Sequence, residues 1–153
     1  MKKMQKGPYS VKGLKSWQAR EGIGYQYSLC ENGKKVAFVH DEGRGGEIEI
    51  DFKDPAARER FDAFLATLPL EKNSFTGEMD PVRDWGFVAE LADTHEQDQR
   101  FKRQCRTKTL IVLKSNEPDQ YTIYKRSFDA EFKALLEKKH GEDLVEIINE
   151  RFL

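Results

Sequence analysis

Residues 24–52 read GYQYSLCENGKKVAFVHDEGRGGEIEIDF, and the two alternating patterns in them indicate an antiparallel sheet. Apolar and polar side chains alternate from Tyr25 to Leu29, and the Asn32-Gly33 pair that follows suits the positive φ angles of a type I′ turn. This predicts a hairpin. In residues 47–52 apolar and acidic residues alternate again, which predicts a third strand with one buried and one solvated face.

Helix signals follow the three strands. Asp54 is the expected N-cap of a helix that starts at Pro55, and apolar residues recur at three- and four-residue spacing until Pro69 stops the pattern. Asp80-Pro81 repeats the start signal and predicts a second helix whose apolar stripe fades after Asp93.

The second half of the chain predicts another hairpin and two more helices. Residues 109–114 and 121–125 are expected to be its strands, and the first of them is apolar on both faces, as a central strand would be. Ser127 is the expected N-cap of a helix that ends near Gly141. Residues 142–152 have the apolar spacing of a final amphipathic helix.

The order of these elements indicates an α+β fold. We expect one antiparallel sheet of about five strands, a three-stranded N-terminal meander plus the second hairpin, with about four helices packed mainly on one face. A length of 153 residues suits a single domain that spans residues 1–153. Residues 1–12 are basic and are expected to form a mobile N-terminal tail.

Composition excludes several classes of protein. The charged fraction is 35%, and no run approaches the roughly 18 apolar residues that a membrane span requires. The basic start of the chain is followed by Gly7-Pro8 rather than by an apolar run, so no secretion signal is expected. Cys30 and Cys105 lack disulfide or zinc spacing. We therefore expect a cytoplasmic protein with free thiols, no metal and no cofactor.

The main candidate binding site is the stretch RFKRQCRTK, residues 100–108, which holds five basic side chains and no acid although the net charge is only −1. Such cations could bind phosphate or an acidic protein, and the aromatic residue could stack on a base. Alternatively the stretch is simply solvated, or it pairs with the acidic strand face at residues 47–51. The candidate residues are Arg100, Phe101, Lys102, Arg103, Arg106 and Lys108.

A glycine-rich loop is a second candidate contact. Gly43, Arg44, Gly45 and Gly46 could present backbone amides and one cation to a partner. No Walker-type lysine follows, and a strand rather than a helix comes next, so a nucleotide site is not favoured. The simpler alternative is a mobile hairpin loop.

Three polar patterns suggest chemistry without completing it. His40 and Asp41 are neighbours on a strand and therefore point to opposite faces. The segment starting at His95 opens like a zincin helix, but Gln99 stands where the second histidine must be. Cys105 lies between two arginines that could lower its pKa, although no base accompanies it.

Residues 24–52 also resemble segments of small uncharacterised proteins of bacteriophages and prophages. The resemblance rests on the hairpin closed by Asn32-Gly33-Lys34-Lys35 and on the acidic, glycine-rich loop after it. It implies a compact accessory protein of a viral or bacterial genome, and it assigns no functional residue.

These observations favour a small, non-enzymatic binding or regulatory protein that contacts a macromolecular partner, with protein favoured over nucleic acid. The first alternative is weak, sequence-independent nucleic-acid binding through residues 100–108. The second is an enzyme in which carboxylates such as Asp41, Glu42 and Asp84 converge in a pocket.

Overall fold

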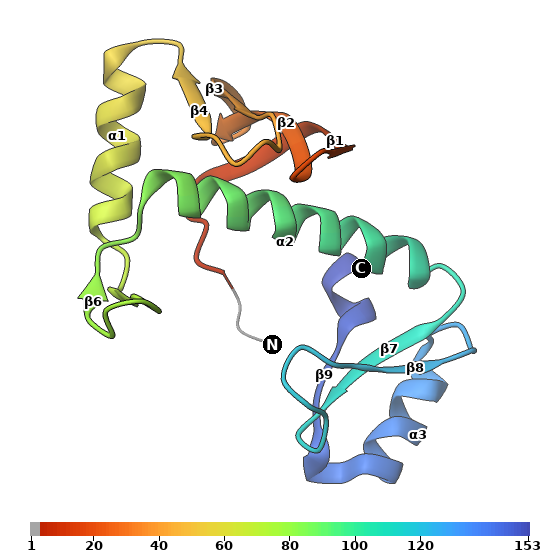
Figure 1. Ribbon diagram of the computed structural model, residues 1–153. Helices are drawn as coiled ribbons and strands as arrows, with labels where there is room; N and C mark the ends of the chain where they lie inside the picture. Colours follow the sequence, from red (N-terminus) through yellow and green to blue (C-terminus); the bar gives the residue numbers. More distant parts are fainter. Residues whose placement is uncertain (1–3) are drawn as a thin grey trace. The chain divides into compact units, whose positions relative to one another are not determined.

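The computed structural model describes residues 4–153, which divide into two compact units (Figure 1). The N-terminal unit contains Met4–His95, and the C-terminal unit contains residues 96–153. Helix α2 (Asp84–Gln104) contributes residues to both. The single domain expected from the sequence stays a prediction.

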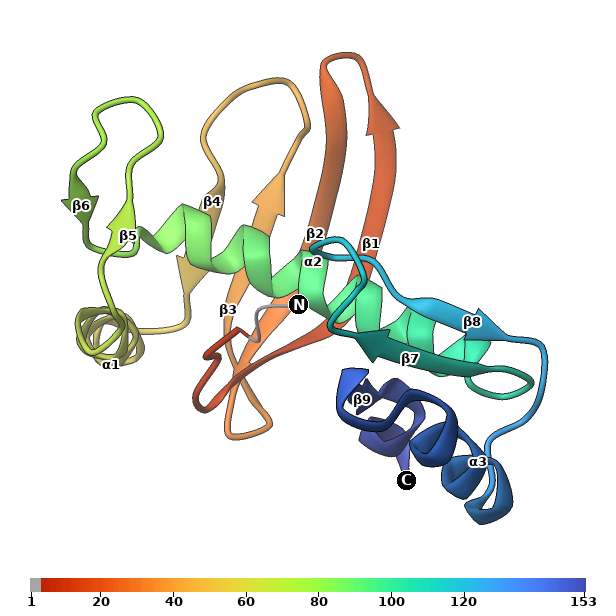
Figure 2. The same ribbon diagram turned by 90° about the horizontal axis from the view of Figure 1, so that it is seen from below.

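The N-terminal unit is built on a four-stranded antiparallel sheet in the order β1-β2-β3-β4 (Figure 2). The strands are β1 (Tyr9–Ala19), β2 (Gly22–Glu31), β3 (Lys34–Asp41) and β4 (Glu49–Phe52). The hairpin between β2 and β3 is confirmed, with φ of 52° at Asn32 and 82° at Gly33. The three-stranded meander is therefore confirmed, and β1 adds a fourth strand to it.

Strand β1 corrects the prediction of a mobile tail over residues 1–12. Residues 1–3 lie outside the described part of the chain, but β1 begins at Tyr9, which pairs with Glu31 of β2. The Tyr9 ring is only 2% exposed, and its centroid lies 5.2 Å from that of Phe61. The sequence pattern did not predict this strand, because lysine, serine and glycine interrupt the apolar residues in it.

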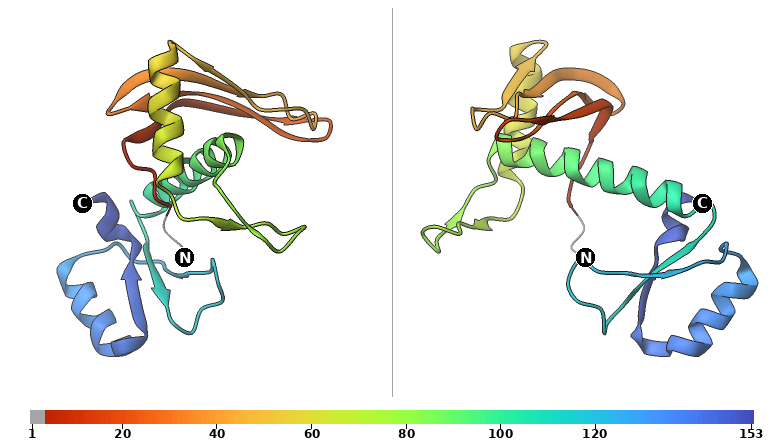
Figure 3. Two further views of the ribbon diagram at one scale, coloured as in Figure 1. Left: turned by 90° about the vertical axis from the view of Figure 1, so that its left-hand side faces the viewer. Right: turned by 45° about the vertical axis from the view of Figure 1, so that its right-hand side comes forward.

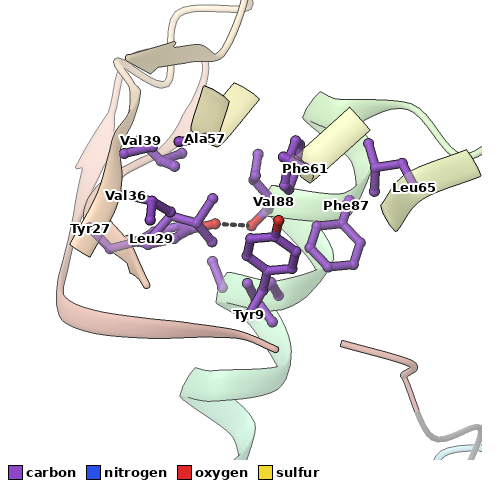
Figure 4. Close-up of a cluster of buried hydrophobic side chains, with 13 residues drawn as sticks. Tyr9, Tyr27, Leu29, Val36, Val39, Ala57, Phe61, Leu65, Phe87 and Val88 are labelled. Atoms are coloured by element: carbon purple, nitrogen blue, oxygen red, sulfur yellow. Dashed lines mark hydrogen bonds between the residues drawn. The ribbon is translucent and has the colours of Figure 1, made fainter. Parts of the chain in front are cut away.

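Helices α1 (Pro55–Ala66) and α2 bury one face of this sheet. Asp54 caps α1 as predicted, because its Oδ1 accepts a hydrogen bond from the Ala57 amide at 2.8 Å. Figure 3 shows α1 beside β4, and the first part of α2 packs into the same core through Phe87, Val88, Leu91 and Ala92. In the core between them, the Tyr27 hydroxyl donates a 2.7 Å hydrogen bond to the Val88 carbonyl (Figure 4).

Helix α2 differs from the prediction at both ends. It begins at Asp84 rather than at Pro81, since a short unpredicted hairpin, β5 (Glu71–Lys72) and β6 (Met79–Asp80), occupies the preceding residues. It also continues through Gln104, although its apolar stripe fades after Asp93. The candidate basic stretch is therefore largely helical.

The C-terminal unit contains a separate three-stranded antiparallel sheet in the order β8-β7-β9. Hairpin β7–β8 is confirmed, and β7 is central as predicted because apolar clusters cover both of its faces. Helix α3 is also confirmed, with Asp129 rather than Ser127 as its N-cap. The elements are β7 (Thr109–Leu113), β8 (Thr122–Tyr124), α3 (Ala130–His140), the 3-10 helices η1 (Gly141–Asp143) and η2 (Ile148–Phe152), and β9 (Leu144–Ile147).

The α+β class is thus confirmed, but the predicted single five-stranded sheet with four helices is wrong. Residues 4–153 form a four-stranded and a three-stranded sheet, the two-stranded hairpin, and three α-helices. The predicted helix over residues 142–152 is replaced by β9 between the two 3-10 helices. Pairing with β7 buries Ile147, and this tertiary contact outweighs the helical spacing of the segment.

Candidate binding surfaces

The basic stretch forms the C-terminal end of α2 and the turn after it. Arg100 to Gln104 are helical, and the turn is closed by the Lys108 amide, which donates to the Gln104 carbonyl at 3.0 Å. Cations near a helix C-terminus are favoured by the helix dipole, which gives these residues a structural role as well. Four of the side chains are exposed (Arg100, Lys102, Arg103 and Arg106), and Lys108 is half-buried.

These cations have no ion-pair partner within the C-terminal unit. Among residues 96–153, the ion pairs involve other bases, Arg126, Lys133 and Arg151. The alternative pairing with acidic residues 47–51 would join the two units, and it stays a prediction. Within their own unit, the exposed cations of α2 are therefore available to an external partner.

Phe101 is a core residue and not a stacking platform for nucleic-acid bases. Its side chain is 1% exposed and packs with Leu110 and Ile148. Its ring meets that of Tyr121 edge-on at a centroid distance of 5.0 Å. Because α2 runs through this stretch, Phe101 turns inward while the neighbouring cations remain exposed. The prediction of Phe101 as a contact residue is therefore wrong.

Cys105 does not lie in the activating environment that its arginine neighbours suggested. Burial raises the pKa of its thiol, and Arg151 opposes this shift only in part. Arg151 forms ion pairs with Glu146 and Asp98, and its guanidinium lies 5.8 Å from the Phe101 ring centroid. Fewer thiolates are therefore present at neutral pH than in an exposed cysteine.

Alkylation by iodoacetamide is expected to test this. Because burial disfavours the thiolate, Cys105 should react more slowly at pH 7 than a short cysteine peptide, and its rate should rise to a plateau only above the ordinary cysteine pKa. Cys30 is 2% exposed and should stay unmodified. The variant Arg103→Ala is the control, and a slower reaction in it would restore the interpretation based on neighbouring arginines.

The glycine-rich loop is packed at one end and open at the other. Gly43 is buried with φ of 77°, and its amide donates to Asp41 Oδ1 at 2.8 Å. A Cβ on Gly43 would lie 2.6 Å from the Gly24 nitrogen and 2.8 Å from the Ala19 Cβ. Gly43 therefore holds the loop against the β1–β2 turn and is not a contact residue, whereas Arg44, Gly45 and Gly46 are exposed.

The carboxylates of the enzyme hypothesis do line pockets. Asp41 and Glu42 border one of about 640 Å³, and Asp41 with Asp84 borders another of about 460 Å³. However, Asp84 is engaged by Arg58 at 3.1 Å and accepts a hydrogen bond from the Trp85 amide at 2.7 Å. Within residues 4–153, no group of three or more His, Cys, Asp or Glu side chains is arranged to hold a metal ion. Asp41 and Asp84 therefore have structural partners, and the two pockets alone assign no reaction.

The three histidines take part in local contacts. His40 lies between Trp17 and Phe38, with ring centroids 5.9 Å and 6.4 Å away, on the sheet face opposite the helices. His140 ends α3, and its Nε2 lies 2.9 Å from the Tyr124 hydroxyl. His95 also has an interaction partner. The row formed by Trp17, His40 and Phe38 was missed in the sequence, although the side-chain alternation of β3 could have placed two of its members together.

A scan against models of protein families finds no match to this chain, and neither do searches of curated proteins and of solved structures. No helix within residues 4–153 is long and apolar enough to cross a membrane.

Proposed function

We propose that this chain is a small, non-enzymatic binding protein of the cytoplasm whose C-terminal unit contacts an acidic protein surface. The observation that carries the proposal is the set of four exposed cations at the end of α2 and in the turn after it, which have no ion-pair partner within residues 96–153 (Arg100, Lys102, Arg103 and Arg106). The phage or prophage origin suggested by the sequence resemblance is part of the same proposal.

The helix end makes this surface suitable for recognition. Phe101 anchors it in the core, so the cations project from a fixed backbone. Clustered charge of one sign speeds association with a partner of opposite charge and selects against similarly charged proteins. Residues 99–116 contain no acid. Of the two acids one helical turn before the cations, Asp98 is engaged by Arg151, which leaves Glu96 four residues before Arg100 on the surface of α2.

An acidic protein is favoured over nucleic acid as the partner, because the basic stretch at residues 100–108 has no exposed aromatic residue on which a base could stack. Single-strand binding combines cations with exposed aromatic faces, and stacking contributes about 1–3 kcal/mol per base. With Phe101 buried, only contacts to phosphate remain, and these make affinity weak and strongly dependent on salt.

Charge reversal tests the proposal. The double variant Arg103→Glu/Arg106→Glu is expected to bind polyglutamate about tenfold more weakly than wild type, because two attractive contacts become repulsive and each exposed pair contributes on the order of 0.2–1 kcal/mol. Titrations would be run by fluorescence anisotropy with labelled polyglutamate, duplex DNA and single-stranded RNA, at low and at physiological salt.

The matched control is Lys125→Glu/Lys138→Glu, which changes net charge equally at exposed positions outside the basic stretch. Equal losses in both variants would show that net charge alone governs binding. Preference for either nucleic acid over polyglutamate at physiological salt would contradict the choice of an acidic protein.

Single-stranded nucleic acid on the outer sheet face of the N-terminal unit is a second candidate function. Trp17 and Phe38 are 36% and 37% exposed there, and Lys35 lies 5.8 Å from the Phe38 ring centroid. Exposed aromatic rings flanked by lysine can stack bases and contact phosphate. This candidate predicts that Trp17→Ala weakens RNA binding, whereas the double variant at Arg103 and Arg106 leaves it unchanged.

A further inference from the structure

The β5–β6 hairpin presents the most exposed aromatic ring among the described residues. Phe75 lies at its tip and is 98% exposed. Leu70, Met79 and Trp85 are 53%, 56% and 58% exposed beside it in the sequence. Phe75 and Trp85 also line one pocket of about 380 Å³. A single exposed apolar residue needs no explanation, but two large aromatic residues that line one pocket and are both more than half exposed are typical of a binding surface.

Hydrogen bonds centred on Asn73 fix the tip. Its Oδ1 accepts from the Phe75 amide at 2.8 Å, and its Nδ2 donates to Asp80 Oδ2 at 2.8 Å. Its backbone amide donates to the Glu78 carbonyl at 2.7 Å, and its carbonyl accepts from the Gly77 amide at 2.8 Å. The turn is thereby held in one conformation while the Phe75 ring projects into solvent.

A rigid turn that supports an exposed aromatic ring favours a binding role for that ring over a ring that is exposed without any function. Binding through a preorganised turn avoids much of the entropy cost of ordering a loop. Large aromatic side chains that fill a partner's pocket commonly dominate interface energies. The Phe75 ring contributes little to the stability of the N-terminal unit, because it is 98% exposed and belongs to none of the described core.

The charges of the hairpin indicate the partner's chemistry. Glu71, Glu78 and Asp80 oppose a single base, Lys72, so the hairpin itself, residues 71–80, carries an excess of negative charge, whereas Arg83 adds a second base to the lining of the adjoining pocket. None of the four charged hairpin residues forms an ion pair among residues 4–153. An anionic bilayer would be repelled, whereas basic side chains around an apolar pocket would be attracted.

We propose that the β5–β6 hairpin docks on a partner protein by inserting Phe75 into an apolar pocket whose rim is basic. This surface lies in the N-terminal unit and does not depend on the cations of α2. The two proposals can therefore fail separately.

Photo-crosslinking and binding together test the proposal. A benzophenone amino acid would replace Phe75 in one sample and Ile23, which is 64% exposed, in a control sample. The expected result is a polypeptide that crosslinks from position 75 and not from position 23. That polypeptide is then purified on its own. It should bind the wild-type chain and Ile23→Ser with equal affinity, and it should bind Phe75→Ser and Glu78→Lys at least tenfold more weakly.

Other outcomes would overturn the proposal. These are equal crosslinking from both positions, unchanged affinity of Phe75→Ser for the purified polypeptide, and a crosslink from position 75 to a second copy of this chain. Cosedimentation with phosphatidylcholine vesicles that is lost in Phe75→Ser would assign the ring to a lipid surface instead. Fluorescence-monitored urea unfolding should show that Phe75→Ser is as stable as wild type, which separates lost docking from lost folding.

Discussion

Replacing Asn149 by leucine is expected to destabilise the C-terminal unit by about 2–4 kcal/mol, because one buried and one part-buried backbone group would lose their partner and each such group costs about 1–3 kcal/mol. Asn149 is 4% exposed in η2. Its Oδ1 accepts from the Leu110 amide at 2.9 Å, and its Nδ2 donates to the Lys108 carbonyl at 2.8 Å. One side chain thus fastens the end of the chain to the start of β7.

Amide hydrogen exchange would measure this effect in the correct unit. Both tryptophans, Trp17 and Trp85, lie in the N-terminal unit, so their fluorescence would not report on β7. A loss of 2 kcal/mol corresponds to about thirtyfold faster exchange of amides such as that of Val112. Glu150→Leu is the control, since it places leucine at an exposed neighbouring position. Equal exchange in both variants would contradict the role of Asn149.

The Asn149 contacts also bear on the proposed binding surface. Lys108 is the last residue of the basic stretch, and its carbonyl accepts one of the two hydrogen bonds that the Asn149 side chain makes. If the basic stretch binds a partner as a preformed surface, Asn149→Leu should weaken binding without changing any charge. Charge reversal at Arg103 and Arg106 should instead weaken binding while β7 exchange stays slow.

Local sequence signals predicted much of the fold. Asn32-Gly33 set the hairpin and Asp54 set the start of α1, because turn and cap preferences depend on a few adjacent residues. Strand β9 could not be predicted in the same way. Its pairing with β7 joins residues more than thirty positions apart, and its apolar spacing also fits a helix.

The candidate site was predicted only in part, for a related reason. Composition alone located the cations of α2, and their exposure agrees with that choice. Phe101 points inward because α2 continues through a polar stretch. The packing of Phe101 with Leu110 supports this continuation, whereas the local sequence of α2 does not reveal it. The exposure of Phe75 was hidden as well, since an isolated phenylalanine in a loop normally suggests burial.

Replacing Gly43 by alanine is expected to destabilise the N-terminal unit by about 2–5 kcal/mol. A left-handed backbone costs a residue with a Cβ about 1–2 kcal/mol, and overpacking adds about 1–3 kcal/mol. Both apply here, because φ is 77° and the new Cβ would lie 2.6 Å from the Gly24 backbone nitrogen. Urea unfolding followed by tryptophan fluorescence would measure the change, since both tryptophans lie in this unit.

Gly46→Ala is the matched control in the same loop. No atom lies within 4 Å of the position its Cβ would take, and its φ is not positive, so the free energy of unfolding should change by less than about 0.5 kcal/mol. If both variants unfolded at the same urea concentration, Gly43 would not be packed against the β1–β2 turn. The loop would then be free along its whole length, and Gly43 would again be a candidate contact residue.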